Sequence, residues 1–541
     1  MATALISPGT LTSVAKPRAR RGTFYVQTWG CQMNEDDSEQ MRLRLAGIGF
    51  EPSDSIQEAC VILLNTCSVR KKPEDKAFSL LGELALLKER RLEIVVGVCG
   101  CMAQLRAEEI RKRAPHVDFV VGTGQLDSIP GLVEETLQLR RFRTRLGLPE
   151  RKGAVVAEVP ARLLLATVEP NVSEGPHESN WPKKSFAGPK ESLRGPKKSF
   201  AEDNLSLADD NLSLAEDNLP LVEDKLSLVG DRRPSFADLR PSTFGLPKLK
   251  AFVPIQYGCD KFCTFCIVPT TRGRERSRPT GDILTEVRAL AGLGTKEVTL
   301  LGQTVNSYGK NLAEGRVPFS KLLWLLAGIP GLERIRYTSP YPRDFTPDLI
   351  ACIRDNPKVM EHVHLPLQSG DDEVLKAMKR VYSVEGFLAI VAALREAVPG
   401  ISLTTDVIVG FPGEDEEQFR RTLEVVGKVR FDGAFMFAYS PRPGTPAAEM
   451  PQVPADAKKR RLSELIALQN GITEESNRAQ VGRVHEVLVE GLSPKNPKML
   501  QGYSREFRMV HFEGPKELRG RIVPVLAEEP HLWGLRGRRE D

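Results

Sequence analysis

Short apolar runs alternate with amphipathic stretches along residues 23–140. The apolar runs are Phe24–Val26, Val61–Leu64, Ile94–Val98 and Phe119–Val121. Helix-like segments between them include Asp36–Leu45 and Glu74–Leu87. Strand, helix and strand at this interval are typical of a parallel sheet with helices on its faces. We therefore predict an open parallel α/β domain over residues 23–140, preceded by a disordered basic leader at 1–22.

The same alternation returns over residues 248–478. The strand-like runs are Phe252–Ile255, Val298–Leu301, Ile335–Ser339, Val363–Leu367, Leu403–Val409 and Ala434–Ala438. Helical patterns separate them, for example Asp282–Ala291, Val374–Met378 and Glu416–Val426. Six βα units in series predict a partial (βα)6 barrel. A basic helix over Ala455–Gln469 closes this region, and residues 479–541 change to a period of two, which predicts a small all-β module.

Residues 141–247 separate these regions and contain repeats. Pro-Lys-Lys-Ser-Phe-Ala occurs twice, beginning at Pro182 and Pro196, and a seven-residue Asp-Asn-Leu-Ser-Leu-Ala-type repeat follows. Its apolar residues have the spacing of a coiled coil. Asp, Asn and Ser fill most other positions and Pro220 interrupts the run, and all of these disfavour helix interiors. We therefore favour a linker with a disordered or weakly ordered low-complexity insert and expect no chemistry there.

Composition limits the class of protein. A chain of 541 residues is too long for one core, and 41% hydrophobic with 27% charged residues is typical of a soluble globular protein. No apolar run is long enough to span a bilayer, so we expect a cytoplasmic protein without a membrane partner. The net charge of +5 does not by itself indicate nucleic-acid binding. The leader lacks acids and carries Lys16, Arg18, Arg20 and Arg21, so a transit peptide and a nucleic-acid-contacting extension both stay open.

Three cysteines lie within eight residues, at Cys259, Cys263 and Cys266, after the first barrel strand. Iron–sulfur clusters prefer thiolate ligands, and three thiolates leave one iron of a [4Fe–4S] cluster open to a substrate or cofactor. A structural zinc site is the alternative, but it usually has four ligands, and no fourth Cys or His is near. The spacing therefore predicts a cluster at the mouth of the barrel, where barrel active sites lie.

A second group of cysteines follows the strands of the N-terminal domain. Cys31, Cys67 and Cys101 each come after a different apolar run. The carboxyl ends of parallel strands line one crevice, so a second three-thiolate cluster is plausible there. Spacing alone does not choose Cys101 over Cys99, which lies two residues earlier. Cys60 and Cys352 have the setting of buried small hydrophobes.

Several strings resemble a known family. Thr28–Asn34, Asn65–Arg70 and Gly100–Gln104 resemble the N-terminal domain of the radical S-adenosylmethionine (SAM) methylthiotransferases. The strings that resemble the radical SAM core of that family are Cys259–Arg278, Gly302–Gly309, His364–Gly370, Asp406–Glu414 and Tyr439–Pro446. The C-terminal module resembles a TRAM domain, a small RNA-binding barrel. The resemblance selects Cys101 over Cys99, and Gln32–Asn34 with Asn65–Ser68 favours the branch that acts on tRNA.

The resemblance implies two [4Fe–4S] clusters, SAM and a reaction. The Cys259, Cys263 and Cys266 cluster would bind SAM and reduce it to a 5′-deoxyadenosyl radical, while the Cys31, Cys67 and Cys101 cluster would carry the sulfur. The radical would remove the C2 hydrogen of N6-isopentenyladenosine at position 37, beside the tRNA anticodon, and a methylthio group would replace it. The implied partners are the tRNA anticodon loop, a reducing electron donor and a sulfur donor. No catalytic side chain beyond the clusters is required.

Weaker predictions concern other residues. Gly302 and Gln303 would lie at the methionine end of SAM, and Gly410 and Gly413 would let the backbone approach its adenine or ribose, although ordinary turn glycines explain these positions as well. The basic residues after the first cluster loop could meet RNA phosphates, with a solvated charged loop as the alternative: Arg272, Arg274, Arg276 and Arg278.

Two other functions stay open at this point. The first is the related enzyme that methylthiolates a ribosomal-protein aspartate. The second is a non-catalytic iron–sulfur redox or RNA-binding protein, which would not cleave SAM.

Overall fold

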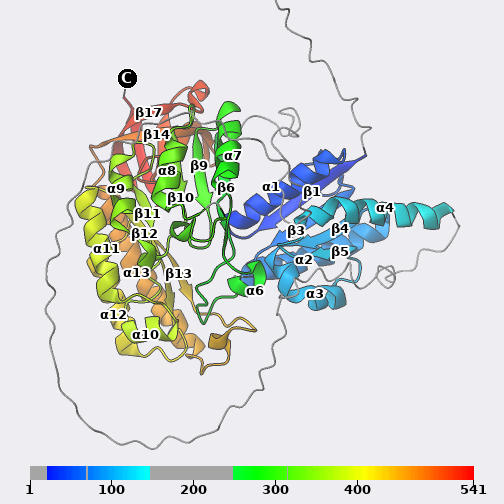
Figure 1. Cartoon of the computed structure of the whole chain (residues 1–541), viewed down its shortest axis with the longest axis horizontal. Helices are drawn as coiled ribbons and strands as arrows, with labels where there is room; N and C mark the ends of the chain where they lie inside the picture. The colour runs from blue at the N-terminus through cyan, green and yellow to red at the C-terminus, as the bar shows by residue number, and fades with distance from the viewer. Residues whose placement is uncertain (1–20, 69–70, 146–247, 314, 541) are drawn as a thin grey trace, which may run out of the picture. The chain divides into compact units, whose positions relative to one another are not determined.

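A computed structural model of the chain describes residues 21–68, 71–145, 248–313 and 315–540 (Figure 1), all within the same unit of packed residues. The predictions for the leader up to residue 20 and for the repeat insert lie outside these residues. No helix in the described ranges is long and apolar enough to cross a membrane.

The N-terminal region forms a five-stranded parallel sheet in the order β2-β1-β3-β4-β5 (Figure 1). Its strands are β1 (Thr23–Trp29), β2 (Glu51–Pro52), β3 (Val61–Thr66), β4 (Val95–Cys99) and β5 (Phe119–Val121), and its helices are α1 (Gln32–Gly47), α2 (Lys71–Arg90), α3 (Cys101–Arg113) and α4 (Ile129–Arg145). Val61 and Leu63 of β3 pack in a cluster with α1 and α4, while Ile62 and Leu64 pack with α2 and α3. This two-sided burial explains the continuous apolar run of β3. The predicted parallel α/β domain is confirmed, with the two-residue strand β2 added.

Six parallel strands form the central region as two three-stranded sheets, ordered β10-β9-β6 and β11-β12-β13. They are β6 (Lys250–Pro254), β9 (Glu297–Leu301), β10 (Arg334–Tyr337), β11 (His362–His364), β12 (Ser402–Val409) and β13 (Gly433–Ala438). A single parallel bridge between Ile335 and Val359 connects the chain across the two sheets. Each of the six predicted runs overlaps one of these strands, which begins one or two residues earlier, so the partial (βα)6 barrel is confirmed.

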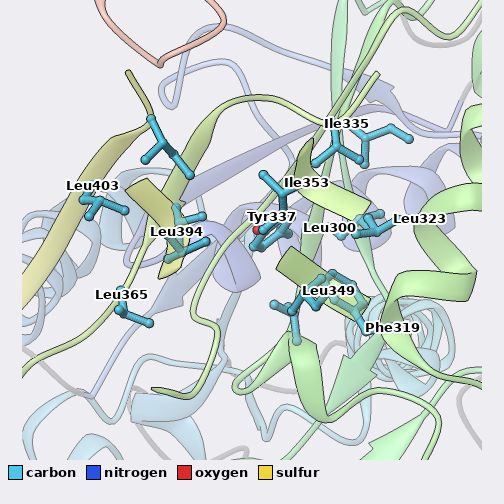
Figure 2. Close-up of a cluster of buried hydrophobic side chains, with 14 of the residues drawn as sticks. Leu300, Phe319, Leu323, Ile335, Tyr337, Leu349, Ile353, Leu365, Leu394 and Leu403 are labelled. Atoms are coloured by element: carbon cyan, nitrogen blue, oxygen red, sulfur yellow. The ribbon is translucent and has the colours of Figure 1, made fainter. Parts of the chain in front are cut away.

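Helices cover the outside of these strands (Figure 1). They are α7 (Thr280–Gly292), α8 (Phe319–Ala327), α9 (Pro347–Asp355), α11 (Val384–Ala397), α12 (Glu416–Val429) and α13 (Ala455–Arg478), while the short α10 (Asp372–Ala377) packs in a separate buried cluster with Phe265. Alternate strand residues point toward the helices, as Figure 2 shows for Leu300, Ile335 and Leu403, which lie in one buried cluster with Phe319 of α8 and Leu394 of α11. The other alternate residues face the inside of the partial barrel. Helix α13 extends beyond the predicted end at residue 469.

The C-terminal residues form a closed five-stranded barrel in the order β14-β15-β16-β18-β17. Its strands are β14 (Val484–Ser493), β15 (Asn496–Tyr503), β16 (Met509–Glu513), β17 (Ile522–His531) and β18 (Gly534–Arg539). Val487 and Val489, two positions apart, point into its buried core with Leu500 and Phe512. The period-two pattern therefore predicted this all-β module correctly.

Buried arginines join this module to the first residues of the parallel strands. Arg334 donates to the carbonyl oxygens of Tyr503 and Glu486, both at 2.8 Å. Arg336 donates to Ser504 O at 2.6 Å and forms an ion pair with Glu297 at 3.1 Å, with both side chains under 5% exposed. The module is thereby fixed at the end of the barrel opposite to the carboxyl ends of the strands.

Replacing Arg336 with methionine is expected to destabilise this junction. The change leaves the Glu297 carboxylate buried without its partner, and breaking one side of a buried ion pair costs about 3–5 kcal/mol. The midpoint of denaturant unfolding should fall, and adding Glu297→Gln should recover part of the loss. An unchanged midpoint in Arg336→Met would contradict this account of the junction.

Candidate functional site

A loop between two short strands carries the first group of cysteines. Strands β7 (Gln256–Tyr257) and β8 (Arg276–Ser277) pair antiparallel and close the loop at its base. The amide of Cys259 also donates to Gly273 O at 3.1 Å. Since β6 ends at Pro254, the loop leaves the carboxyl end of the first barrel strand, where active sites of barrel enzymes lie.

The three thiols of this loop lie close enough to influence one another. Cys259 and Cys263 are buried, and Cys266 is half-buried. Burial raises the pKa of Cys259 to about 11 and that of Cys266 to about 12, and the negative charge of the neighbouring cysteines also raises both. Thiols in this state become ligands by giving up their protons as metal binds. The structure thus brings together the three cysteines that the sequence grouped.

Arg380 is a further member of this site that sequence reasoning missed. Its guanidinium donates to Cys263 Sγ at 3.4 Å and lies 4.7 Å from the ring centre of Tyr341 and 5.0 Å from that of Tyr382. A fixed cation beside a thiolate ligand offsets its negative charge. No local pattern marks Arg380, because it lies 117 residues from Cys263 along the chain.

The second group meets at the carboxyl ends of three strands. Cys31 precedes α1, Cys67 follows β3, and Cys101 begins α3. A hydrogen bond with the Cys67 side chain lowers the pKa of Cys31 to about 6 despite its burial, and the nearby charge of Arg272 lowers it as well. Burial raises the pKa of Cys101, and Arg272 opposes that shift. The predicted convergence of these cysteines is therefore present in the structure.

Two buried asparagines hold the chain around this second group. Asn65 Nδ2 donates to Asn34 O at 2.7 Å, and Asn34 Nδ2 donates to Asn65 Oδ1 at 3.1 Å. Gly100 has a φ of 90°, and a Cβ there would lie 2.2 Å from Asn65 Oδ1. Only glycine fits at this turn from β4 into Cys101. These asparagines lie in the strings Gln-Met-Asn and Asn-Thr-Cys, which were the available sequence signal.

The three remaining cysteines lie elsewhere. Cys99 ends β4 inside the sheet–helix cluster with Phe24 and Met41, and burial raises its pKa strongly. Cys352 is buried on α9 in the barrel core, as a small hydrophobe would be. Cys60 is half-buried just before β3.

The donor sets of the two groups fit iron–sulfur clusters. Each offers three thiols and a neighbouring guanidinium, and thiolates are the ligands that such clusters take. Among the described residues, no three Cys, His, Asp or Glu side chains could hold one metal ion. A cluster does not require that, because each thiolate binds a different iron and the ligands stand around the cluster.

A polar group beside the first cysteine loop fits a bound cofactor. Gln256 is buried, and its Nε2 has no hydrogen-bond partner among the described residues, while its Oε1 accepts from Thr304 N at 3.3 Å. Thr304 Oγ1 also donates to Glu275 Oε2 at 3.1 Å. Gly302 lies against Gln256, because a Cβ there would be 3.1 Å from its Oε1. A buried donor without a partner is costly, so this end of β9 is suited to a polar ligand.

The other predicted cofactor contacts stay predictions. Gln303 is half-buried next to this polar group. Gly410, at φ 68°, packs against Lys458, whose Cγ would be 2.2 Å from a Cβ, so local packing alone requires glycine there. Gly413, at φ 83°, is exposed with open space at its Cβ position.

The four arginines after the loop divide into two pairs. Arg272 forms a buried ion pair with Asp37 at 2.7 Å, and Arg278 pairs with Glu286 at 2.7 Å, with its side chain 13% exposed. Both side chains are largely buried against these partners, which argues against RNA contact at Arg272 and Arg278. Arg274 pairs with Asp260 at 2.8 Å, but its side chain is 73% exposed, and Arg276 is exposed as well. RNA contact stays a prediction for Arg274 and Arg276.

A parallel partial barrel with a three-cysteine loop at the carboxyl ends of its strands defines the class of radical SAM enzymes. Residues 253–426 match the family model described as "Radical SAM superfamily", which implies SAM and a [4Fe–4S] cluster. Residues 23–122 match "Uncharacterized protein family UPF0004", and residues 478–538 match "TRAM domain".

Relatives along nearly the whole chain narrow the class to one family. The chain is 41% identical to a "tRNA-2-methylthio-N(6)-dimethylallyladenosine synthase" of Moorella thermoacetica, over 96% of this chain and 99% of the relative. It is 39% identical to the protein of that name from Bacillus subtilis, over 95% of this chain and 85% of the relative. The chain therefore belongs to the tRNA-2-methylthio-N(6)-dimethylallyladenosine synthase family.

A solved structure of the radical SAM methyltransferase TsrM from Kitasatospora setae is also similar. It is 15% identical, with a TM-score of 0.45, and the match covers 79% of this chain and 75% of that chain.

Proposed function

We propose that this chain methylthiolates C2 of N6-isopentenyladenosine at position 37 of tRNA, giving 2-methylthio-N6-isopentenyladenosine. The relatives that match 95% or more of this chain carry the name of this activity. The observation that supports it most directly is the pair of three-cysteine groups, one on the barrel loop and one at the strand ends of the N-terminal sheet. One group without the other would suit a simpler radical SAM enzyme.

The two groups would hold different clusters. Cys259, Cys263 and Cys266 would hold the cluster that binds SAM, and Cys31, Cys67 and Cys101 would hold a second [4Fe–4S] cluster. When bound, these cofactors supply the radical that removes the C2 hydrogen and the methylthio group that replaces it.

The chain's own residues would position these groups and balance their charge. Arg380 offsets the charge at Cys263, and the Gln256, Thr304 and Glu275 group offers donors and acceptors to the polar end of SAM. The C-terminal barrel, a TRAM domain by its family match, would contact the tRNA. A reducing electron donor and a sulfur donor complete the partners, and we place the reaction in the cytoplasm.

Mass spectrometry of tRNA nucleosides tests this function. A strain lacking the gene should lose the 2-methylthio nucleoside and accumulate N6-isopentenyladenosine, and the intact gene should restore it. An unchanged 2-methylthio signal, together with loss of methylthio-aspartate from ribosomal protein, would assign the chain to the related protein-modifying branch instead.

Arg274 offers a test of the tRNA contact. Replacing this exposed residue with glutamine should weaken tRNA binding about equally for all sequences and reduce the slope of log K against log salt by about 1, as loss of one phosphate contact does. Fluorescence anisotropy at several salt concentrations measures both. Arg354→Gln, on the exposed surface of α9, is the matched control. Equal slopes in the two variants would exclude a phosphate contact at Arg274.

A further inference from the structure

Arg272 is a buried arginine that follows the first group of cysteines in the sequence but lies beside the second group of cysteines. It ends α6 (Val268–Arg272), the five-residue helix that begins two residues after Cys266. Its guanidinium forms the 2.7 Å ion pair with Asp37 of α1, and the side chains are 6% and 5% exposed. The two residues are 235 positions apart, so this contact joins the radical SAM region to the N-terminal domain.

The same guanidinium also reaches the second cysteine group. Arg272 lies close enough to Cys101 and Cys31 for its charge to act on both thiols. Its helix is held there by a hydrogen bond from Thr123 Oγ1 to Thr271 O at 2.6 Å. Helix α3, which begins at Cys101, contacts α6 as well. Arg272 is therefore positioned from both sides rather than free to swing away.

The negative charges expected around the second cysteine group explain why it needs a fixed cation. Three thiolates at Cys31, Cys67 and Cys101 and the Asp37 carboxylate would put four negative charges in a largely buried space. Buried charges are tolerated when they are paired. Arg272 pairs with the Asp37 carboxylate and interacts electrostatically with Cys101 and Cys31. Half-buried Arg442, which follows β13, interacts electrostatically with Cys67. Both arginines come from residues 248–478, and none of the three cysteines does.

We propose that Arg272 is a positioning residue for the cluster held by Cys31, Cys67 and Cys101, so that this cluster site is assembled by two domains and is complete only when the radical SAM region is docked. The inference rests on the proposed function in taking these three cysteines as cluster ligands. Through Asp37 and Cys101, Arg272 fixes the thiolates and offsets their charge. The simpler alternative is that Arg272 serves only as the counter-ion of Asp37.

A variant series in the full chain separates the two readings. The background carries Cys259→Ala, Cys263→Ala and Cys266→Ala, so that only the second cluster is counted after anaerobic reconstitution. Onto it are placed Asp37→Asn, Asp37→Asn with Arg272→Gln, Arg272→Lys, and the control Arg274→Gln, which alters an exposed arginine two residues away. The double variant leaves no unpaired Asp37 charge and so avoids the main reason for misfolding. Iron and sulfide per chain and the midpoint potential from an EPR-followed redox titration are the readouts.

The double variant is expected to hold less than about half of the iron of Asp37→Asn alone and to show a lower midpoint potential. Removing a positive charge beside the cluster disfavours the electron-rich reduced state. Arg272→Lys should restore part of both properties, and Arg274→Gln should match the background. Equality of the double variant with Asp37→Asn in iron and in potential would overturn the proposal. A background that binds no iron at all would instead overturn the proposed second cluster.

Discussion

Replacing Cys259, Cys263 and Cys266 together with alanine is expected to end the reductive cleavage of SAM and all methylthiolation. The loop holds these three thiols at the carboxyl end of the first barrel strand, and Arg380 stands beside Cys263. No other described cysteine lies on this loop, so no substitute ligand is at hand. Iron after reconstitution should fall from about eight to about four per chain, because one [4Fe–4S] cluster is lost and the other keeps its ligands.

The matched control for this variant is Cys352→Ala. Cys352 is also a buried cysteine of the barrel region, 2% exposed, but it packs in the core on α9. Its replacement should cost about 1 kcal/mol in stability and leave iron and activity intact. The measurements are iron and sulfide analysis and chromatography of 5′-deoxyadenosine formed under strong reductant. A triple variant that still formed 5′-deoxyadenosine would show that the radical chemistry has another origin.

Much of the frame that holds these cysteines follows from hydrophobic patterning. A fully apolar run such as Val61–Leu64 predicts a central parallel strand, and the structure buries its residues in two opposite clusters. Because parallel strands end at one edge, strand prediction alone placed the cysteines after β1, β3 and β4 near each other. Short pairings were not predictable, since β7 and β8 have two residues each and carry no period.

The positions of the arginines near the cysteine groups could not be predicted from the sequence, because they depend on contacts between residues far apart along the chain. Four arginines at alternate positions after the cluster loop have the same local pattern, yet Arg272 is buried and Arg274 is exposed. The difference arises from Asp37, which α1 presents to Arg272 and not to Arg274. Arg380 likewise acquires its position only through the packing of the loop on α10, where Thr264 Oγ1 donates to Ala377 O at 2.9 Å. Charge patterning along the chain does not contain this information.

Local sequence pattern also cannot decide whether Cys99 or Cys101 is the third ligand of the proposed second cluster. A period of two would put both side chains on one face of a continuing strand. At Gly100 the backbone takes a φ of 90° and the strand gives way to α3, so the alternation ends between the two cysteines. Cys99 stays in the core with Phe24, and Cys101 joins Cys31. Family resemblance predicts Cys101 as the ligand, and the turn at Gly100 supports this prediction because it separates Cys101 from the strand core.

The variants Cys101→Ala and Cys99→Ala should therefore differ sharply in iron content and activity, although the two residues are only two positions apart. Cys101→Ala removes a thiol that interacts with Cys31 and Arg272, so about four of about eight irons per chain should be lost. The variant should still cleave SAM, because the Cys259 loop is untouched, but tRNA should receive no methylthio group. Such a separation of the two activities would assign the sulfur step to the N-terminal group.

Cys99→Ala should keep both clusters and both activities. Cys99 is fully buried in the apolar cluster with Phe24 and Met41, on the core side of the turn at Gly100, so its thiol is not presented to the cluster site. Alanine fills most of its space in the apolar cluster, and the expected loss of stability is about 1 kcal/mol. Iron counts, 5′-deoxyadenosine and the 2-methylthio nucleoside should be measured on both variants side by side. If Cys99→Ala lost iron and product as Cys101→Ala is expected to, Cys99 would be the third ligand and the path of the chain at Gly100 would differ in the loaded protein.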